Sequence, residues 1–158
     1  MKAATVKEIK DELKMRSSDE LEQLCLRLSR FKKENKELLT YLLFESEDEE
    51  QYIRSVKQHI DSQLDQINTS SLYYIKKSAR KILRETKKYI RYTSVKETEI
   101  ELLLYYCRSL YEFHPSVGRN RTLMNLLKRQ VALVVKKLPS LHEDLQYDYR
   151  EELDRLPF

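Results

Sequence analysis

Glycine is almost absent from this chain, which holds a single one, Gly118, and three prolines among 158 residues. Average usage would give about 11 glycines in a chain of this length. Because β-sheets need glycine for hairpin turns and bulges, its scarcity predicts an all-α fold of helices joined by short polar turns. The length is that of one domain with a hydrophobic core, which we expect to span residues 1–158.

Long apolar segments are also missing. The longest runs, such as "VALVV" at 131–135, have five residues, whereas a helix that spans a membrane needs about 20. Met1 is followed by charged residues and not by the apolar segment of a secretory signal. We therefore expect a cytoplasmic protein.

Residues that carry catalytic or metal chemistry are few. The only cysteines, Cys25 and Cys107, are far apart, form no CxxC motif and lie on apolar stripes, so we expect two reduced core thiols. His59, His114 and His142 fall in different predicted helices, without HxxxH, HExxH or ExxH spacing. A single glycine excludes glycine-rich phosphate loops. We predict no enzymatic activity, no metal and no cofactor.

Apolar residues recur at helical spacing along most of the chain. Thr5 with Glu8, and Ser94 with Glu97, have the spacing of capping boxes that begin helices. Near residues 33–35, where "KKENKE" interrupts the apolar pattern, either two helices meet or one long helix runs through, and the interruption favours a break. The pattern predicts seven or eight antiparallel helices, over about 5–15, 19–31, 36–44, 48–68, 71–92, 94–114, 122–138 and 139–156.

Three of these segments carry more specific expectations. Residues 114–121, "HPSVGRNR", hold the only glycine and are predicted to be a loop. Residues 122–138 are the most apolar segment and are expected to be the most buried, and Pro139 is expected to begin the last helix. Helix pairs of about 40–45 residues have the dimensions of HEAT-like hairpins, but no residue signature recurs. The architecture is therefore either an array of helical hairpins or an irregular bundle.

The strongest functional signal is the basic segment 71–92, which carries eight Lys or Arg residues and one acid, Glu85. On a helical wheel its apolar residues fall within an arc of about 120°, and all the cations fall on an adjoining arc of about 140°. The predicted binding residues are these cations together with two arginines of the glycine loop: Lys76, Lys77, Arg80, Lys81, Arg84, Lys87, Lys88, Arg91, Arg119 and Arg121.

Two explanations fit this cationic arc. From residue 45 onward the net charge alternates in sign from one predicted helix to the next, so neighbouring helices of the chain could neutralise each other along their flanks. However, Lys77, Lys81, Arg84 and Lys88 point nearly opposite the core, toward solvent or a partner. The sequence therefore favours a scaffold module that binds an acidic protein surface, and the alternative is a protein that binds the phosphate backbone of RNA or DNA.

Tyrosine is abundant, with eleven residues in the chain. Tyr73, Tyr74 and Tyr92 are expected at the rim of the basic helix, where they could contact a protein or stack on the bases of a single strand. Contact with a membrane surface is not expected, because Ala79 and Thr86 interrupt the apolar face, which has no Trp or Phe. The basic helix is thus the predicted functional element.

Overall fold

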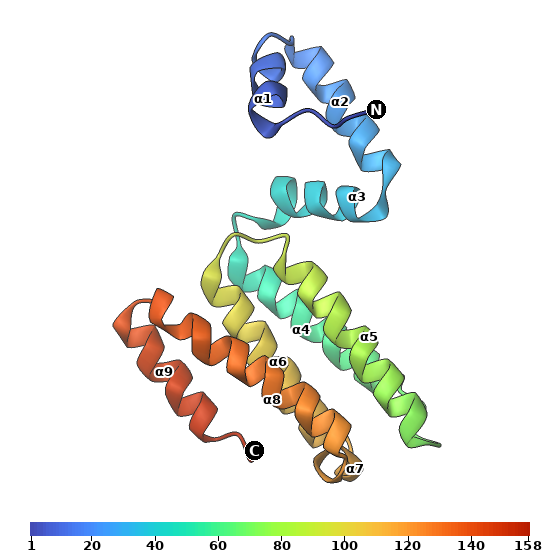
Figure 1. Ribbon diagram of the computed structural model, residues 1–158, viewed down its shortest axis with the longest axis vertical. Helices are drawn as coiled ribbons and strands as arrows, with labels where there is room; N and C mark the ends of the chain where they lie inside the picture. The colour runs from blue at the N-terminus through green and yellow to red at the C-terminus, as the bar shows by residue number, and fades with distance from the viewer. The chain divides into compact units, whose positions relative to one another are not determined.

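The structure is a computed structural model that describes residues 1–158, and it is entirely helical (Figure 1). It contains nine α-helices and no strand, and sequential helices pack antiparallel, which confirms the predicted all-α class. None of the helices combines the length and the apolar character needed to span a membrane. The contacts divide the chain into two compact units, Met1–Phe44 and Glu45–Phe158. The assignment of the whole chain to one domain stays a prediction.

The first unit consists of α1 (Val6–Lys14), α2 (Ser18–Phe31) and α3 (Lys33–Thr40), followed by a π-helical turn at Tyr41–Glu45. The predicted capping box of Thr5 and Glu8 begins α1, and Ser17 with Glu20 forms a second box that begins α2. Lys32 is extended, so the predicted break between helices is present.

No side chain of α1, α2 or α3 is buried. Ile9, Leu13 and Leu24 line an open groove of about 700 Å³ between α1 and α2. Cys25 is exposed on α2, so its prediction as a core thiol is wrong. The apolar stripe of α2 therefore stays exposed, with Leu28 and Phe31 among its exposed residues.

The second unit is a bundle built around one central helix (Figure 1). Its elements are α4 (Glu49–Asp65), α5 (Leu72–Ile90), α6 (Lys96–Phe113), α7 (Pro115–Arg119), α8 (Arg121–Lys137), a 3₁₀ turn (Leu138–Ser140) and α9 (Glu143–Asp154). Helix α6 packs against α4, α5 and α8, and two side-chain contacts join it to α9: Tyr149 to Glu97, and Arg108 to Glu152.

The prediction that residues 122–138 are the most buried segment is wrong. Eight residues of α6 are buried but only four of α8. Helix α6 has neighbours on several sides, whereas Leu133 and Val135 of α8 remain exposed. The position of a helix in the bundle therefore decides its burial more than its apolar content does.

Two helix starts also differ from the prediction. Ser94 and Glu97 form no capping box: Val95 precedes α6 without a side-chain cap, and Glu97 instead accepts a hydrogen bond of 2.9 Å from the Tyr149 hydroxyl. Pro139 lies in the 3₁₀ turn, and α9 begins only at Glu143, after His142. In both places the helix begins later in the chain than the local pattern predicts.

The predicted loop at 114–121 contains the short helix α7. Gly118 has no positive φ, so no left-handed conformation requires it. A Cβ atom at this position would lie 3.1 Å from Cε2 of Tyr111, closer than most side chains tolerate. The only glycine of the chain therefore allows α7 to approach the Tyr111 ring of α6.

Candidate anion-binding face

Helix α5 is held in the bundle by an apolar stripe that fixes which way its other side chains point. The buried residues of the stripe are Ile75, Ala79, Ile82, Leu83, Thr86 and Ile90. Two hydroxyls from other helices anchor its backbone: Tyr106 donates to the carbonyl oxygen of Ala79 and Tyr52 to that of Tyr89, both at 2.8 Å. These contacts set the rotation of α5, and its cations therefore project away from the core.

The only acid of α5 lies on the side of the helix that faces α4. The carboxylate of Glu85 is 3.0 Å from Nε2 of His59, and the His59 ring meets the edge of Tyr89 with centroids 5.4 Å apart. Glu85 is therefore bonded to α4 and is not available to the cations of α5.

Helix α5 and its C-cap residue Arg91 carry eight cations, and the side chains of seven make no ion pair and no hydrogen bond. They are Lys76, Lys77, Arg80, Lys81, Arg84, Lys87 and Arg91, and we call them the basic face. The eighth, Lys88, has its ammonium 4.8 Å from the centroid of the Tyr89 ring. The ion pairs between helices of this unit lie elsewhere: Lys57 with Glu101, His59 with Glu85, Arg108 with Glu152, and Lys137 with Glu99. Neutralisation by neighbouring helices, the first of the two explanations, thus involves none of the seven.

A groove of about 690 Å³ follows the first half of α5. It is lined by Tyr73, Tyr74, Lys76, Lys77, Ser78, Arg80, Lys81 and Arg84, without any acid. Tyr73 is 66% exposed and Tyr74 44%, and their rings meet edge to face with centroids 5.4 Å apart. The groove therefore combines accessible aromatic rings with cations that lack partners.

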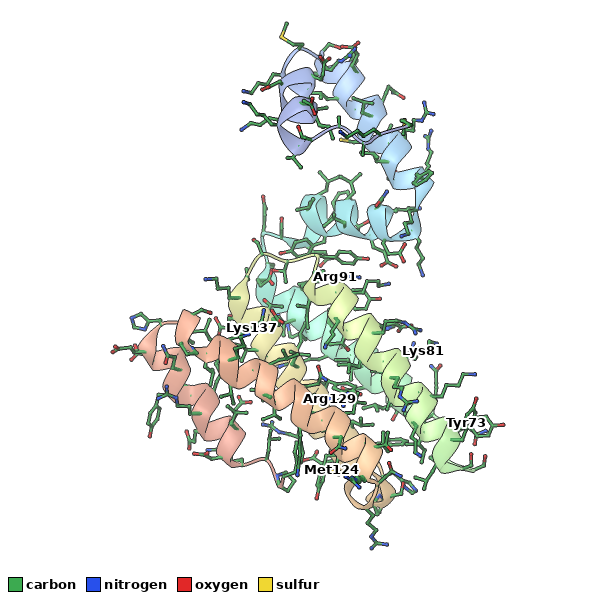
Figure 2. The ribbon with its side chains drawn as sticks, in the orientation of Figure 1. Tyr73, Lys81, Arg91, Met124, Arg129 and Lys137 are labelled. Carbon is green, nitrogen blue, oxygen red and sulfur yellow. The ribbon has the colours of Figure 1, made fainter.

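A smaller hollow of about 170 Å³ lies between α5 and α8. Its lining consists of Arg80 from α5 and of Thr122, Leu123, Asn125, Leu126 and Arg129 from α8. Figure 2 shows Arg129 on α8 and Lys81 on α5, the two helices that face the viewer. Because Arg80 lines both the groove and the hollow, the two form one continuous cationic surface.

Sequence reasoning missed the residues that α8 contributes to this surface, among them Arg129. A signal was present, since residues 119–138 hold several cations and no acid. Their position beside α5 depends on both helices packing against α6, which the pattern of one helix does not reveal.

The remaining predicted residues lie outside the groove and the hollow. Arg119 ends α7 and Arg121 begins α8, both exposed, and neither is among the lining residues. Tyr92 is half-buried and its ring meets that of Tyr89 with centroids 6.1 Å apart. Of the predicted rim, the structure thus brings Tyr73 and Tyr74 to the groove but not Tyr92.

The other chemically versatile side chains are separate from this surface and from one another. His114 and His142 each accept a backbone hydrogen bond at the start of a helix. Cys107 is buried, and burial raises its pKa to about 12. The chain holds no group of three or more His, Cys, Asp or Glu residues arranged to bind a metal ion.

No protein-family model, no curated protein and no solved structure matches this chain. The geometry of the basic face, the groove and the hollow is therefore the basis for the function proposed below.

Proposed function

We propose that this protein is a non-enzymatic interaction module whose basic face binds an acidic partner. The observation that supports the proposal is the set of seven α5 cations without ion pairs. Lys77 and Lys81, like Arg80 and Arg84, are four residues apart on one helix, a spacing at which like charges repel by a few tenths of a kcal/mol per pair. The anions of a partner would offset this repulsion.

The partner belongs to one of two classes, an acidic protein surface or the phosphate backbone of a nucleic acid. Both would use the same cations, and both complexes would weaken as salt screens the charges. We place this activity in the cytoplasm, where an exposed thiol such as that of Cys25 stays reduced.

The proposal is tested with two anionic probes, poly-L-glutamate and a single-stranded oligonucleotide, at about 50 and about 200 mM salt. Replacement of Lys77, Lys81 and Arg84 together by Gln removes three charges from exposed positions of the basic face. We expect this variant to bind the preferred probe about 10-fold more weakly or worse at the lower salt concentration.

The matched control removes three charges from the first unit by replacing Lys2, Lys7 and Lys10 with Gln. These lysines are also exposed and make no ion pair, so the overall charge of the two variants is equal. The affinity of the control for either probe should change by no more than about 2-fold, because salt screens most of the long-range attraction from its distant charges. The proposal is wrong if neither probe binds, or if both variants lose affinity equally.

A further inference from the structure

The hollow between α5 and α8 is lined by hydrogen-bond donors that the protein itself does not use. The guanidinium groups of Arg80 and Arg129 make no ion pair or hydrogen bond. The Thr122 hydroxyl and the Asn125 side-chain amide likewise have no hydrogen-bond partner. The bond between Thr122 and the Asn120 side chain uses the backbone N–H of Thr122 and leaves its hydroxyl free. Four polar side chains from two helices thus converge on one space of about 170 Å³.

The charge and shape of this hollow suit a phosphate group. Arginine presents five N–H donors in a planar fork that matches two oxygens of a phosphate, and two such forks can hold the oxygens of one tetrahedral group from two directions. The side chains of Leu123, which is buried, and Leu126 supply an apolar wall. The four polar side chains are exposed, so a phosphate can reach them from solvent.

The groove next to the hollow indicates which molecule carries the phosphate. Arg80 belongs to both, and the groove leads from it along α5 to Tyr73 and Tyr74. In an edge-to-face pair such as theirs, one ring keeps both faces outside the pair and the other keeps one face. Exposed aromatic faces beside a cationic groove are the arrangement on which the bases of a single strand stack.

We infer that the hollow between Arg80 and Arg129 binds a backbone phosphate of a single-stranded nucleic acid, whose neighbouring bases stack on Tyr73 and Tyr74. The inference rests on the proposed function and narrows its partner to one class. A duplex would present its phosphates to the same cations, but its stacked bases would not reach the tyrosine rings. An acidic protein would offer planar carboxylates and would not need the tyrosine faces.

The test measures binding of a fluorescein-labelled oligodeoxythymidine of about 12 nucleotides by fluorescence anisotropy. The two variants are Arg80→Gln and Arg129→Gln, and each should weaken binding about 10-fold or more, as expected for the loss of charge-assisted hydrogen bonds. Because both arginines hold one phosphate, the double variant should lose less than the product of the two single losses. A fully multiplicative loss would contradict a shared phosphate.

The matched control is Lys128→Gln, which removes a charge one position before Arg129. Lys128 is exposed, makes no ion pair and does not line the hollow, so its loss should weaken binding by no more than about 2-fold. If Lys128→Gln and Arg129→Gln weaken oligonucleotide binding equally, the hollow is not a specific phosphate site.

The tyrosines are tested with the double variant Tyr73→Leu/Tyr74→Leu, which keeps apolar bulk and removes the aromatic faces. It should bind the oligonucleotide at least about 5-fold more weakly and should leave binding of the matched DNA duplex unchanged. Unchanged binding of the single strand would overturn the stacking role.

Poly-L-glutamate separates failure of this inference from failure of the proposed function. We expect it to bind more weakly than the oligonucleotide and to be insensitive to Tyr73→Leu/Tyr74→Leu. Suppose instead that poly-L-glutamate binds more tightly than the oligonucleotide, and that replacing Lys77, Lys81 and Arg84 by Gln abolishes this binding. The partner is then an acidic protein, so the inference is wrong and the proposed function stands. If neither probe binds, both are wrong.

Discussion

Tyr106 of α6 donates a hydrogen bond of 2.8 Å to the backbone carbonyl of Ala79 in α5, and both residues are fully buried. Burial raises the pKa of the Tyr106 hydroxyl, so the group stays protonated and able to donate at any physiological pH. Ala79 lies at the centre of the buried stripe of α5, on the side opposite the outermost cations. This bond therefore helps to hold the basic face in its orientation.

Replacement of Tyr106 by Phe should lower the free energy of unfolding by about 1 kcal/mol, the usual loss for one hydrogen bond. Tyr106→Ala should lower it by about 3–5 kcal/mol, because a large buried ring is then replaced by a cavity. Urea unfolding measures both changes. Tyr147→Phe is the control, since Tyr147 is 71% exposed and should shift the value by less than about 0.5 kcal/mol.

The two cysteines should differ sharply in reactivity. Cys25 is exposed, whereas Cys107 is buried and burial raises its pKa to about 12, which keeps it a thiol and not the reactive thiolate. An aromatic disulfide reagent should therefore modify one cysteine in the folded protein and both in denaturant. The variant Cys25→Ser should show no rapid modification under native conditions. Rapid reaction of two thiols in the native wild type would contradict the burial of Cys107.

Removing a cation should stabilise the protein where its neighbours are other cations and destabilise it where it pairs with a carboxylate. Lys81→Gln removes like-charge repulsion with Lys77 and should raise the free energy of unfolding by about 0.2–0.5 kcal/mol. Lys57→Gln should lower it by up to about 1 kcal/mol, because Lys57 pairs with Glu101 at 2.6 Å and lies 5.1 Å from the centroid of the Tyr105 ring.

Denaturant unfolding at about 0.05 and about 1 M salt tests the electrostatic origin of both effects. The gain from Lys81→Gln should vanish at high salt, where the screening length falls to about 3 Å. A gain that persists at high salt would show that charge repulsion on α5 is not its cause.

The capping boxes of the first unit should make its helices sensitive to acid. Hydrogen bonds from the backbone N–H and the hydroxyl of Thr5 lower the pKa of Glu8 below its usual 4.5, and the backbone N–H of Ser17 is the main cause of a lowered pKa at Glu20. Because both pKa values are lower in the folded state, the boxes stabilise the helices above pH 4.5 and lose this effect as the pH falls through the lowered values.

Carboxyl titration by NMR should therefore give midpoints below 4.5 for both residues. Thr5→Ala removes the hydroxyl but keeps the backbone N–H, so it should raise the midpoint of Glu8 only part of the way to 4.5 and leave that of Glu20 unchanged. Ser17→Ala should raise only the midpoint of Glu20, and by less, because the main donor to Glu20 is the retained backbone N–H. Each variant is thus the control for the other. Midpoints at or above 4.5 in the wild type would be incompatible with the boxes.

The features that the sequence predicted well are those set by residues close together in the chain. The box of Thr5 and Glu8 spans three positions, and the wheel of α5 depends only on the order of its own residues. The same reasoning failed at Ser94 and Glu97, because Tyr149 bonds Glu97 from 52 positions away. Distant contacts of this kind leave no trace in the spacing of nearby residues.

The cationic surface was likewise predictable only in the part that depends on residues close together in the chain. The alternation of charge along the chain suggested that successive helices pair, yet α5 and α8 both pack on α6. Two basic helices therefore lie on one face, and Arg80 and Arg129 share a hollow. The cations of α5 were identified from the sequence, whereas their neighbours on α8 could be identified only once the packing was known.

Helices α5 and α8 run in the same direction, since each is antiparallel to α6, and both begin at the end of the bundle where α7 lies (Figure 1). Neither has an acid in its first turn, whereas α4 and α6 each have two there. The positive ends of these two peptide macrodipoles thus meet no carboxylate in their own first turns, and within that turn they add to the side-chain charge of the two helices; the negative ends of α4 and α6 lie at the same end of the bundle. Because such end charges act within about one turn, their attraction for an approaching polyanion is local to the first turns of α5 and α8, near Tyr73 and Thr122, where it adds to the steering by the side-chain charges.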